Sequence, residues 1–504
     1  MNFWPGHSGI SISNLPIAPL PTRMVIIRNL KAGLVYRHAV SRALSSGPRR
    51  RRPLEPSNVT NPASAPGLRR ALKLRHLILY GIIIIQPTAP MGIYGVVCNA
   101  ARGHVVTTIL IAMVAMLLTA VSYGRMARIY PSAGSAYTYV GHEIHPTAGY
   151  VVGWSMLMDY MLNPIICAIW CSAAAQNILP QVPYAAWVLA FAILFTGLNL
   201  LGVQASSRVN EFLAIGMGVV VVVFLAYAIR YIASIARPAG YAWLMPFYDP
   251  ARYKASSLLH GTSLAVLTYI GFDGISTMSE EVENPRRNIM LATVLTCLAI
   301  GVLSAVEVYV AQLAWPFTAA FPENLVDTAY VQVALRVGGH FLFQLLNATL
   351  LIANIGSGIA AQFGAARLLY GMGRANALPR RFFGSVSPHN NIPRNNVILL
   401  GLITLVGAFL LTYEKGAELL NFGAFIAFIG VNAAALIHYK FRSREKVFLA
   451  ATIPAAGIAI CTFIWFNLSR NAKLLGFAWV IVGLLVYLLM RGKRAGDATL
   501  EDAF

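Results

Sequence analysis

Gln86-Pro87-Thr88-Ala89-Pro90-Met91-Gly92 interrupts an apolar segment, residues 74–98, that is otherwise long enough to cross a membrane. A second segment of this kind, residues 257–281, is interrupted by Gly271-Phe272-Asp273-Gly274. A helix in lipid must satisfy its own backbone hydrogen bonds, so a break at mid-depth is tolerated only beside protein or a water-filled cavity. Paired interruptions in the two halves of a membrane protein are the strongest indication that a sequence gives of a transport site.

The composition indicates that most of the chain lies in a membrane. The 504 residues are 57% hydrophobic and 11% charged, with a mean hydropathy of +0.64, whereas about a quarter of the residues in soluble domains are charged. Because one span needs about 20 apolar residues, the sequence predicts an all-α polytopic membrane protein with about twelve transmembrane helices. The ninth and twelfth are expected to be short. The predicted spans are residues 74–98, 105–128, 146–176, 184–203, 209–236, 257–281, 289–316, 338–370, 396–412, 418–440, 447–467 and 474–490.

The net charge of +21 is explained by topology and does not indicate a nucleic-acid partner. If the N-terminus is cytoplasmic, the inward-facing loops and the C-terminus hold seventeen Lys and Arg residues after residue 76, and the outward-facing loops hold nine. This asymmetry is the positive-inside pattern of membrane proteins, although the stretch 230–254 runs against it. We therefore expect a multi-pass protein of the cytoplasmic membrane with a cytoplasmic N-terminus.

The two ends of the chain lie outside the predicted spans. Residues 1–73 include Arg49-Arg50-Arg51-Arg52 and a stretch rich in Pro, Ser and Asn. We interpret them as a basic, disordered cytosolic tail or as the product of a start codon placed too early, and their composition also resembles that of a transit peptide. Residues 491–504 are predicted to form a cytosolic C-terminal tail.

Nothing in the sequence indicates a cofactor or an enzyme. The five cysteines (Cys98, Cys167, Cys171, Cys297 and Cys461) are scattered in or beside apolar spans and lack the close pairing of a zinc site. The P-loop pattern of nucleotide-binding proteins is missing, and no Ser/His/Asp or His-cluster arrangement stands near a membrane face. We expect no metal, no cofactor and no catalytic residue.

Three motifs carry the strongest further signal. Residues 130–139 (Tyr-Pro-Ser-Ala-Gly-Ser-Ala-Tyr-Thr-Tyr) follow the second span, residues 271–281 lead into Asn284-Pro285-Arg286-Arg287-Asn288, and residues 366–374 close the eighth span. In this order and spacing, over about residues 68 to 490, they resemble the amino acid–polyamine–organocation permease superfamily. Gln86-Pro87, and Gly153-Trp154-Ser155 with Asp159, make the chain most similar to its bacterial putrescine importer subgroup.

The resemblance implies an inverted-repeat fold of five plus five helices. Spans 1–5 (residues 74–236) and spans 6–10 (residues 257–440) would form the two repeats, with spans 11 and 12 (residues 447–490) appended. The two broken segments, residues 74–98 and 257–281, are the first span of each set of five, which agrees with this division.

The two breaks are the predicted substrate site. Half-helix ends expose unpaired backbone groups, of which the N–H groups suit a carboxylate and the C=O groups suit an ammonium. Glycine at a break lets backbone approach a ligand, although glycine and proline are common in membrane helices generally. The candidate substrate-binding residues are Thr88, Met91, Gly92, Ile93, Asp159, Tyr269, Gly271, Phe272, Asp273 and Gly274.

The first break departs from the pattern of amino-acid permeases. Typical members have Gly-Ser-Gly-Ile-Phe where this chain has Pro90-Met91-Gly92-Ile93-Tyr94, and proline lacks the N–H that would bind a carboxylate. This favours a substrate without a carboxylate, such as a diamine. The putrescine importers, however, have an acidic residue where this chain has Gly92. The choice between an amino acid and a polyamine therefore stays open.

Acidic residues inside or at the ends of predicted spans are candidate coupling or gating positions, because they are costly in a membrane. Asp273 would bind a substrate amine, relay a proton or cap the break, and Asp159 would face the substrate or a neighbouring helix. Glu307 would be a proton site or a contact between helices. Glu280 and Glu281 would form gate ion pairs or ordinary interfacial pairs.

We expect a secondary active transporter that imports amino acids or polyamines by alternating access. The mid-membrane carboxyl groups favour coupling to protons, with sodium symport and exchange as alternatives. The lysine that some relatives carry in span 5 corresponds here to Met217, which argues against one scheme of proton coupling. A second class of function is a nutrient sensor that binds an amino acid or amine without net transport and signals through its tail. The sequence leaves the oligomeric state open.

Overall fold

The computed structural model describes residues 72–131, 135–202, 207–235, 243–279, 282–316, 320–374, 378–387, 392–443 and 448–494. Nearly all of the predicted N-terminal tail and most of the predicted C-terminal tail lie outside these ranges. Glu280 and Glu281 lie outside them too, so their predicted gate pairs stay predictions.

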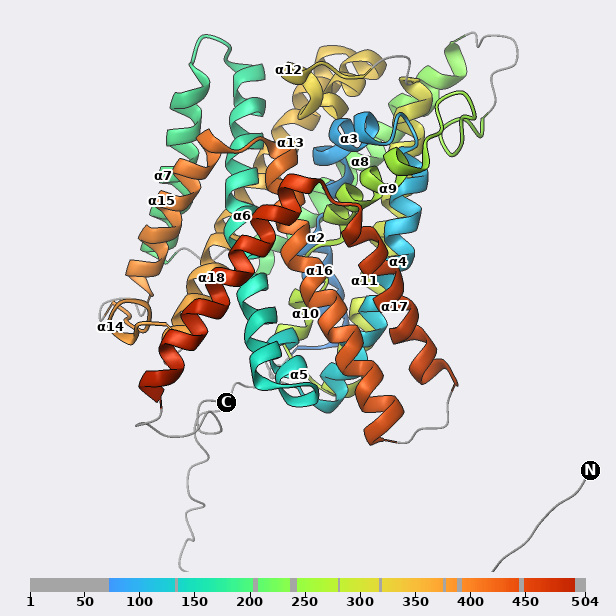
Figure 1. Cartoon of the computed structure of the whole chain (residues 1–504). Coiled ribbons are helices and arrows are strands. Elements are labelled where there is room, and N and C mark those ends of the chain that lie inside the picture. The colour runs from blue at the N-terminus through green and yellow to red at the C-terminus, as the bar shows by residue number, and fades with distance from the viewer. Residues whose placement is uncertain are drawn as a thin grey trace, which may run out of the picture. The chain divides into compact units, whose positions relative to one another are not determined.

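The described residues form a helical bundle in which a helix occupies each of the predicted spans (Figure 1). Within these ranges, nine helices are long and apolar enough to cross a membrane, and the bent pair α2 and α3 makes a tenth span. The helices are α2 (Leu74–Ile85), α3 (Ala89–Ala100), α4 (Val105–Ile129), α5 (Ser135–Glu143), α6 (Pro146–Ile178), α7 (Tyr184–Leu201), α8 (Ser207–Ser234), α9 (Ala255–Ala265), η1 (Val266–Tyr269), α10 (Gly274–Thr277), α11 (Pro285–Ala314), α12 (Glu323–Val326), α13 (Ala329–Arg374), α14 (Arg380–Phe383), α15 (Arg394–Leu410), α16 (Tyr413–Ile437), η2 (His438–Arg442), α17 (Phe448–Phe466) and α18 (Arg470–Arg494).

The lengths of two helices bear on the sequence predictions. The ninth span, α15, is short as predicted, with 17 residues. The twelfth span was predicted to be short, and this is wrong, because α18 has 25 residues. The helix extends beyond the apolar residues 474–490 at both ends, into residues such as Lys473 and Arg491, which hydropathy does not assign to a span. The prediction of an all-α polytopic membrane protein is confirmed.

The first break is narrower than the sequence suggested. α2 ends at Ile85 and α3 begins at Ala89, so Pro90, Met91 and Gly92 lie in the first turn of a helix. Proline is favoured at this position because its missing N–H would have no helical partner there. The axis of the span turns by 41° between α2 and α3.

The second break separates α9 and η1 from the single turn of α10, as the sequence predicted. Gly271 has φ +116°, a backbone conformation that only glycine adopts without strain. The start of the first broken segment and the end of the second are tied together at one end of the bundle, because the N–H of Glu283 donates to the carbonyl of Leu72 (2.9 Å).

The bundle has two opposite ends, each marked by a short helix. The end with α5 and α14 is called the α5 face, and the end with α12 and residues 243–254 is called the α12 face; they lie at the bottom and top of Figure 1. Between them, α6 packs against α13 and α16, and α4 packs against α11. These long helices surround the two breaks and hold them in the interior.

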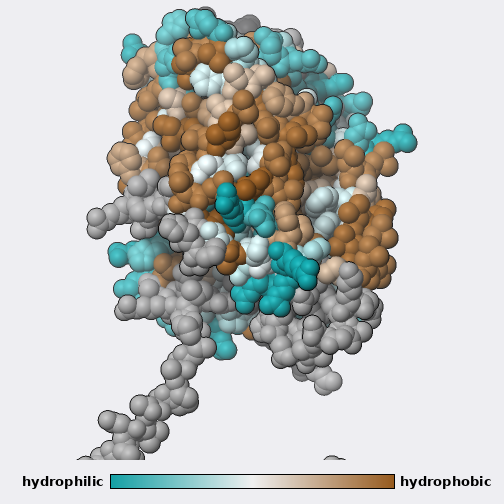
Figure 2. All heavy atoms as spheres, turned by 90° about the vertical axis from the view of Figure 1, so that its left-hand side faces the viewer, coloured by the Kyte–Doolittle hydropathy of each residue, from teal (hydrophilic) through white to brown (hydrophobic). Residues whose placement is uncertain are grey.

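An apolar band surrounds the bundle between its two ends. Figure 2 shows this band on the side formed by α7, α15 and α18, with hydrophilic residues above it. It consists of exposed side chains such as Ile193, Leu410 and Leu489, which are 61%, 75% and 74% exposed. In water such a surface would be strongly unfavourable, so it faces lipid.

A pair of tryptophans docks α18 onto α6. The indole of Trp154 donates to the carbonyl of Trp479 (2.9 Å), and Trp479 donates to the carbonyl of Trp154 (3.0 Å). The two rings stack with centroids 4.8 Å apart. Gly483 lies directly beneath Trp154, and a Cβ there would overlap the indole.

We expect Gly483→Val to weaken this contact, since overpacking a close-packed site costs about 1–3 kcal/mol. The purified variant should unfold at a lower temperature than the wild type in a thermal-shift measurement in detergent. Gly216→Val is the matched control, because the space at Gly216 is open. Equal melting temperatures for Gly483→Val and the wild type would contradict the prediction.

Candidate functional site

The two breaks lie against each other in the interior. A Cβ at Gly271 would overlap the side chain of Ile84, and a Cβ at Gly274 would lie 3.3 Å from the same side chain. Gln86, whose φ is +68°, donates through Nε2 to the carbonyl of Ala353 on α13 (2.9 Å). The breaks predicted from sequence are thus parts of one centre, to which α13 is also tied.

The start of α3 offers few free backbone donors. The N–H of Ala89 donates to the carbonyl of Gln86 (3.1 Å), and that of Met91 donates to the carbonyl of Thr88 (3.0 Å). Pro90 has no N–H. Since neighbouring groups already use two donors and a third is missing, this helix start is poorly suited to bind a carboxylate.

Three further candidate residues of the first break are buried, namely Thr88, Gly92 and Ile93. The hydroxyl of Thr88 lies 3.8 Å from the sulfur of Met217 on α8. Met217 is therefore an uncharged neighbour of the first break. A Cβ at Gly92 would lie 3.5 Å from the hydroxyl of Tyr413 and 3.9 Å from Nε1 of Trp170, so α16 and α6 line this part of the centre.

Asp159 on α6 and Asp273 at the second break are both buried in the interior, where they are 8% and 6% exposed. Both also act on the hydroxyls of Tyr123 on α4 and Tyr160 on α6. Neither carboxyl group forms an ion pair with a described Lys, Arg or His residue. The described part of the protein therefore supplies no cation to either of these two buried carboxyl groups.

The alternative role for Asp273, capping exposed N–H groups at the break, stays a prediction. Asp273 occupies the N-cap position of α10, and its side chain makes no capping hydrogen bond to that helix. The backbone N–H groups of Gly271, Asp273 and Gly274 nevertheless act on its carboxyl group.

Aromatic rings enclose the acidic pair. Phe272 lies 5.5 Å from Tyr123, edge to face, and 5.3 Å from Phe428, stacked. The faces of such rings attract ammonium groups. Tyr269 lies in η1 and donates through its hydroxyl to the carbonyl of Ile109 (2.8 Å), so its polar atom is already used in packing η1 against α4.

Glu307 lies elsewhere, on α11. Its side chain is fully buried, and neither carboxyl oxygen has a hydrogen-bond partner. Its backbone carbonyl accepts from the hydroxyl of Tyr330 on α13 (3.2 Å). The structure thus separates Glu307 from the pair formed by Asp159 and Asp273.

The structure reveals a polar cluster at the α5 face that was not predicted from the sequence. Glu143 on α5 accepts from the hydroxyl of Tyr130 (2.7 Å), lies 2.7 Å from Nδ1 of His438 and pairs with Nε of Arg442 (3.2 Å). Burial, followed by the hydrogen bond to Glu143, raises the pKa of Tyr130 to about 12, so its hydroxyl remains a donor. Tyr130 opens the motif 130–139, which was the available signal, whereas His438 and Arg442, the other partners of Glu143, lie far along the chain in η2.

The same α5 helix also contacts the second break. The hydroxyls of Ser135 and Ser276 lie 2.7 Å apart, which joins α5 to α10. The motif that follows the second span therefore closes the centre towards the α5 face.

A second unpredicted contact joins α6 to the α12 face. Nε1 of Trp170 donates to the carbonyl of Asp327 (2.8 Å), the residue that follows α12. Burial, and then the charge of Glu414, raise the pKa of Asp327 to about 6. Trp170 is the same side chain that faces Gly92, so the α12 turn is linked to the first break through one indole.

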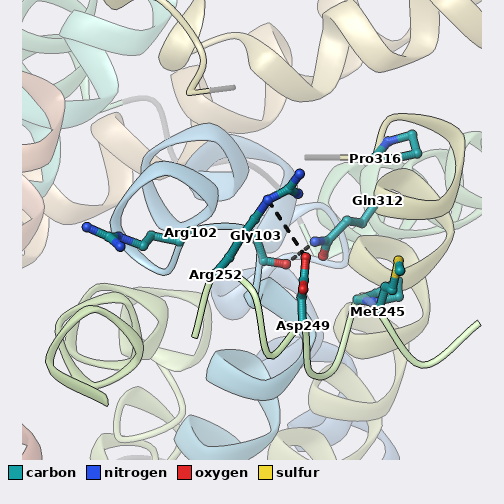
Figure 3. Close-up of a pocket in the computed structure, with 8 residues that line it drawn as sticks. Arg102, Gly103, Met245, Asp249, Arg252, Gln312 and Pro316 are labelled. Atoms are coloured by element: carbon teal, nitrogen blue, oxygen red, sulfur yellow. Dashed lines mark hydrogen bonds and ion pairs between the residues drawn. The ribbon is translucent and has the colours of Figure 1, made fainter. Parts of the chain in front are cut away.

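A small pocket opens at the α12 face, away from the breaks (Figure 3). It is lined by Arg102, Gly103, Met245, Pro246, Asp249, Arg252, Gln312 and Pro316. Arg252 pairs with Asp249 (3.7 Å), and Gln312 donates to the carbonyl of Gly103. Its volume of about 40 Å³ is far below the roughly 300–1,000 Å³ of small-molecule sites. None of the candidate site residues lines it.

Comparison with known proteins agrees with this arrangement. Residues 81–499 match the model of the family described as amino acid permease. The low-affinity putrescine importer PlaP of Escherichia coli K12 is 32% identical over 436 residues, covering 85% of this chain and 95% of that protein. The branched-chain amino acid permease BcaP of Lactococcus lactis is 26% identical over 457 residues, covering 84% and 95%. The methylthioribose transporter of Bacillus subtilis is 24% identical over 475 residues, covering 88% and 98%.

The three relatives match over nearly their whole length, and the family match spans the positions of both breaks, of Asp159 and of Asp273. The chain is a membrane transporter of amino acids or polyamines and belongs to the amino acid permease family.

Proposed function

We propose that this protein imports a diamine such as putrescine across the cytoplasmic membrane by alternating access, coupled to protons. The observation that carries the proposal is the pair of buried carboxyl groups, Asp159 and Asp273, which lack a cation among the described residues. Two buried carboxylates repel each other and lose hydration. A ligand with two ammonium groups would relieve both costs.

The start of α3 supports the same choice. An amino acid would need backbone donors for its carboxylate, and Pro90 supplies none while Ala89 and Met91 use theirs in turns. A diamine needs no such donors. The putrescine importer PlaP, at 32% identity, is a relative whose substrate fits this chemistry.

We further propose that the α5 face is cytoplasmic. It carries Arg374, Arg380 and Arg381 beside α14 and Arg394 at the start of α15. An excess of Lys and Arg on one side marks the cytoplasmic side of a membrane protein. Import would then run from the α12 face to the α5 face.

A second candidate substrate is a neutral amino acid. BcaP, which is 26% identical over most of both chains, is described as a branched-chain amino acid permease. In that case a carboxylate would have to use the remaining backbone groups around Gly92, and one acidic residue would stay without a partner.

Uptake by the purified protein in proteoliposomes tests these alternatives. We expect labelled putrescine to accumulate, and more so with an inward proton gradient. Unlabelled competitors should separate the roles of the charges: butylamine lacks one ammonium, 4-aminobutyrate replaces it by a carboxylate, and ornithine adds a carboxylate. Each should compete at least about 10-fold less well than putrescine, since losing a desolvated charge partner costs about 2–5 kcal/mol.

Protein-free vesicles and vesicles with a collapsed gradient are the controls. Uptake of branched-chain amino acids without putrescine uptake would overturn the diamine proposal. Putrescine binding without accumulation would favour the nutrient sensor over the transporter.

A further inference from the structure

Five acidic side chains are almost fully buried in the described part of the chain, namely Glu143, Asp159, Asp273, Glu307 and Glu418. Four of them have a chemical environment that accounts for a charge. Glu143 pairs with His438 and Arg442, Glu418 accepts from the hydroxyl and N–H of Ser469 (2.5 and 3.3 Å), and the two aspartates form the proposed diamine site. Among these five, Glu307 is the one whose two carboxyl oxygens are both fully buried and without a hydrogen-bond partner in the described residues.

Glu307 also lies in a group of unsatisfied hydroxyls. The hydroxyl of Ser304, one turn earlier on α11, has no hydrogen-bond partner, and neither has the hydroxyl of Tyr94 on α3. Tyr330 bridges these residues: its hydroxyl donates to the backbone carbonyl of Glu307, and its ring lies 5.3 Å from that of Tyr94, edge to face. A buried carboxylate without partners is strongly disfavoured, whereas a neutral carboxyl group is tolerated.

We propose that the carboxyl group of Glu307 is the site that binds the coupled proton during transport. This inference rests on the proposed function, proton-coupled diamine import, and assigns the proton to a residue separate from the substrate acids. Asp159 and Asp273 are then left ionised to hold the two ammonium groups.

The position of Glu307 explains how the proton is coupled to substrate movement. Tyr94 belongs to α3, two residues after Gly92, so the contact of Tyr94 with Tyr330 joins the first break to the surroundings of Glu307. At Gly95 the helix α3 packs so closely on α12 and α13 that a Cβ would overlap the carbonyl of Val326. When α3 moves away from this contact, Glu307 gains access to water and exchanges its proton. Return of α3 buries Glu307 again, and this step requires the carboxyl group to be neutral.

Among the described residues, Tyr330 from α13 is the titratable group that interacts with Glu307, and Tyr94 from α3 lies against Tyr330. Helix α8 contributes the ring of Phe224, which lies 4.8 Å from Tyr330. None of the described basic residues pairs with Glu307, so a proton is the cation left to neutralise it.

Glu307→Gln in the full-length protein tests the proposal, because glutamine mimics the protonated form and cannot release a proton. Two assays in proteoliposomes separate coupling from folding: accumulation of putrescine driven by a proton gradient, and exchange of external labelled putrescine for internal putrescine without a gradient. We expect accumulation to fall by about 10-fold or more while exchange stays within about threefold of the wild type. Gradient-driven accumulation at the wild-type level would overturn the proposal.

Two further variants complete the design. Glu418→Gln is the matched control, a buried acid with hydrogen-bond partners, and it should keep both activities. Glu307→Asp retains a titratable carboxyl group and should keep gradient-driven uptake with a shifted pH profile. This variant tests the proposal if Glu307→Gln does not fold. An unchanged pH profile of uptake would then count against the proposal. A wild-type protein that fails to exchange putrescine would contradict the proposed function instead.

Discussion

Replacing Asp273 by asparagine is expected to lower the affinity for putrescine by about 100-fold, and replacing Asp159 should do the same. Removing one partner of a desolvated charge pair costs about 2–5 kcal/mol, because the ammonium group is left buried without its counter-charge. Both carboxyl groups are buried beside the same break, so each substitution should remove one of two equivalent contacts. Binding of labelled putrescine to the purified variants measures the effect.

The sharper readout of this prediction is discrimination between substrates. The wild type should prefer putrescine to butylamine, and each Asp→Asn variant should lose most of that preference because a single carboxylate needs a single ammonium. Asp249→Asn is the matched control, since Asp249 pairs with Arg252 at the α12 face, away from the breaks. A preference for putrescine that survives in both Asp159→Asn and Asp273→Asn would rule out the two-carboxylate site.

Replacing Gly95 by alanine is expected to block the conformation seen here. The added Cβ would overlap the backbone carbonyl of Val326 and lie 2.6 Å from the Cβ of Ala329. A backbone atom cannot rotate away as a flexible side chain does, so relief requires α3 to separate from α12. Overpacking of this kind costs about 1–3 kcal/mol, and we expect uptake to fall by about 10-fold or more.

The thiol of Cys98 reports on this separation. Cys98 lies on α3 and is 1% exposed, so it should react slowly with a water-soluble maleimide in the wild type and faster in Gly95→Ala, after replacement of the other four cysteines. Gly197→Ala is the matched control, because nothing lies within 4 Å of a Cβ at that position on α7. Equal rates of Cys98 alkylation with glycine and with alanine at position 95, both after replacement of the other four cysteines, would show that α3 accommodates the added methyl group without moving.

The sequence predicted the helical class, a helix in each apolar segment and the two breaks, because these follow from properties read along the chain. The thickness of the bilayer sets the number of apolar residues in a span. Gly271 and Asp273 are unfavourable inside a helix whatever the neighbouring helices are. The limits of the elements were less accurate. Pro90 and Met91 were assigned to the break, yet they begin α3, since proline interrupts a helix from within but starts one well.

Only the tertiary structure decided which residues meet. Asp159 and Asp273 were separate candidates in the sequence, and in the structure both act on Tyr123 and Tyr160, which places them in one buried region. Glu143 with His438, and Gly92 with Trp170, are pairs of the same kind. Hydropathy is almost the same for any rotation of a buried helix, so it cannot specify these partners. The rotation is fixed by close contacts between side chains, as where Gly483 accepts the ring of Trp154 and Gly95 accepts the backbone of Val326.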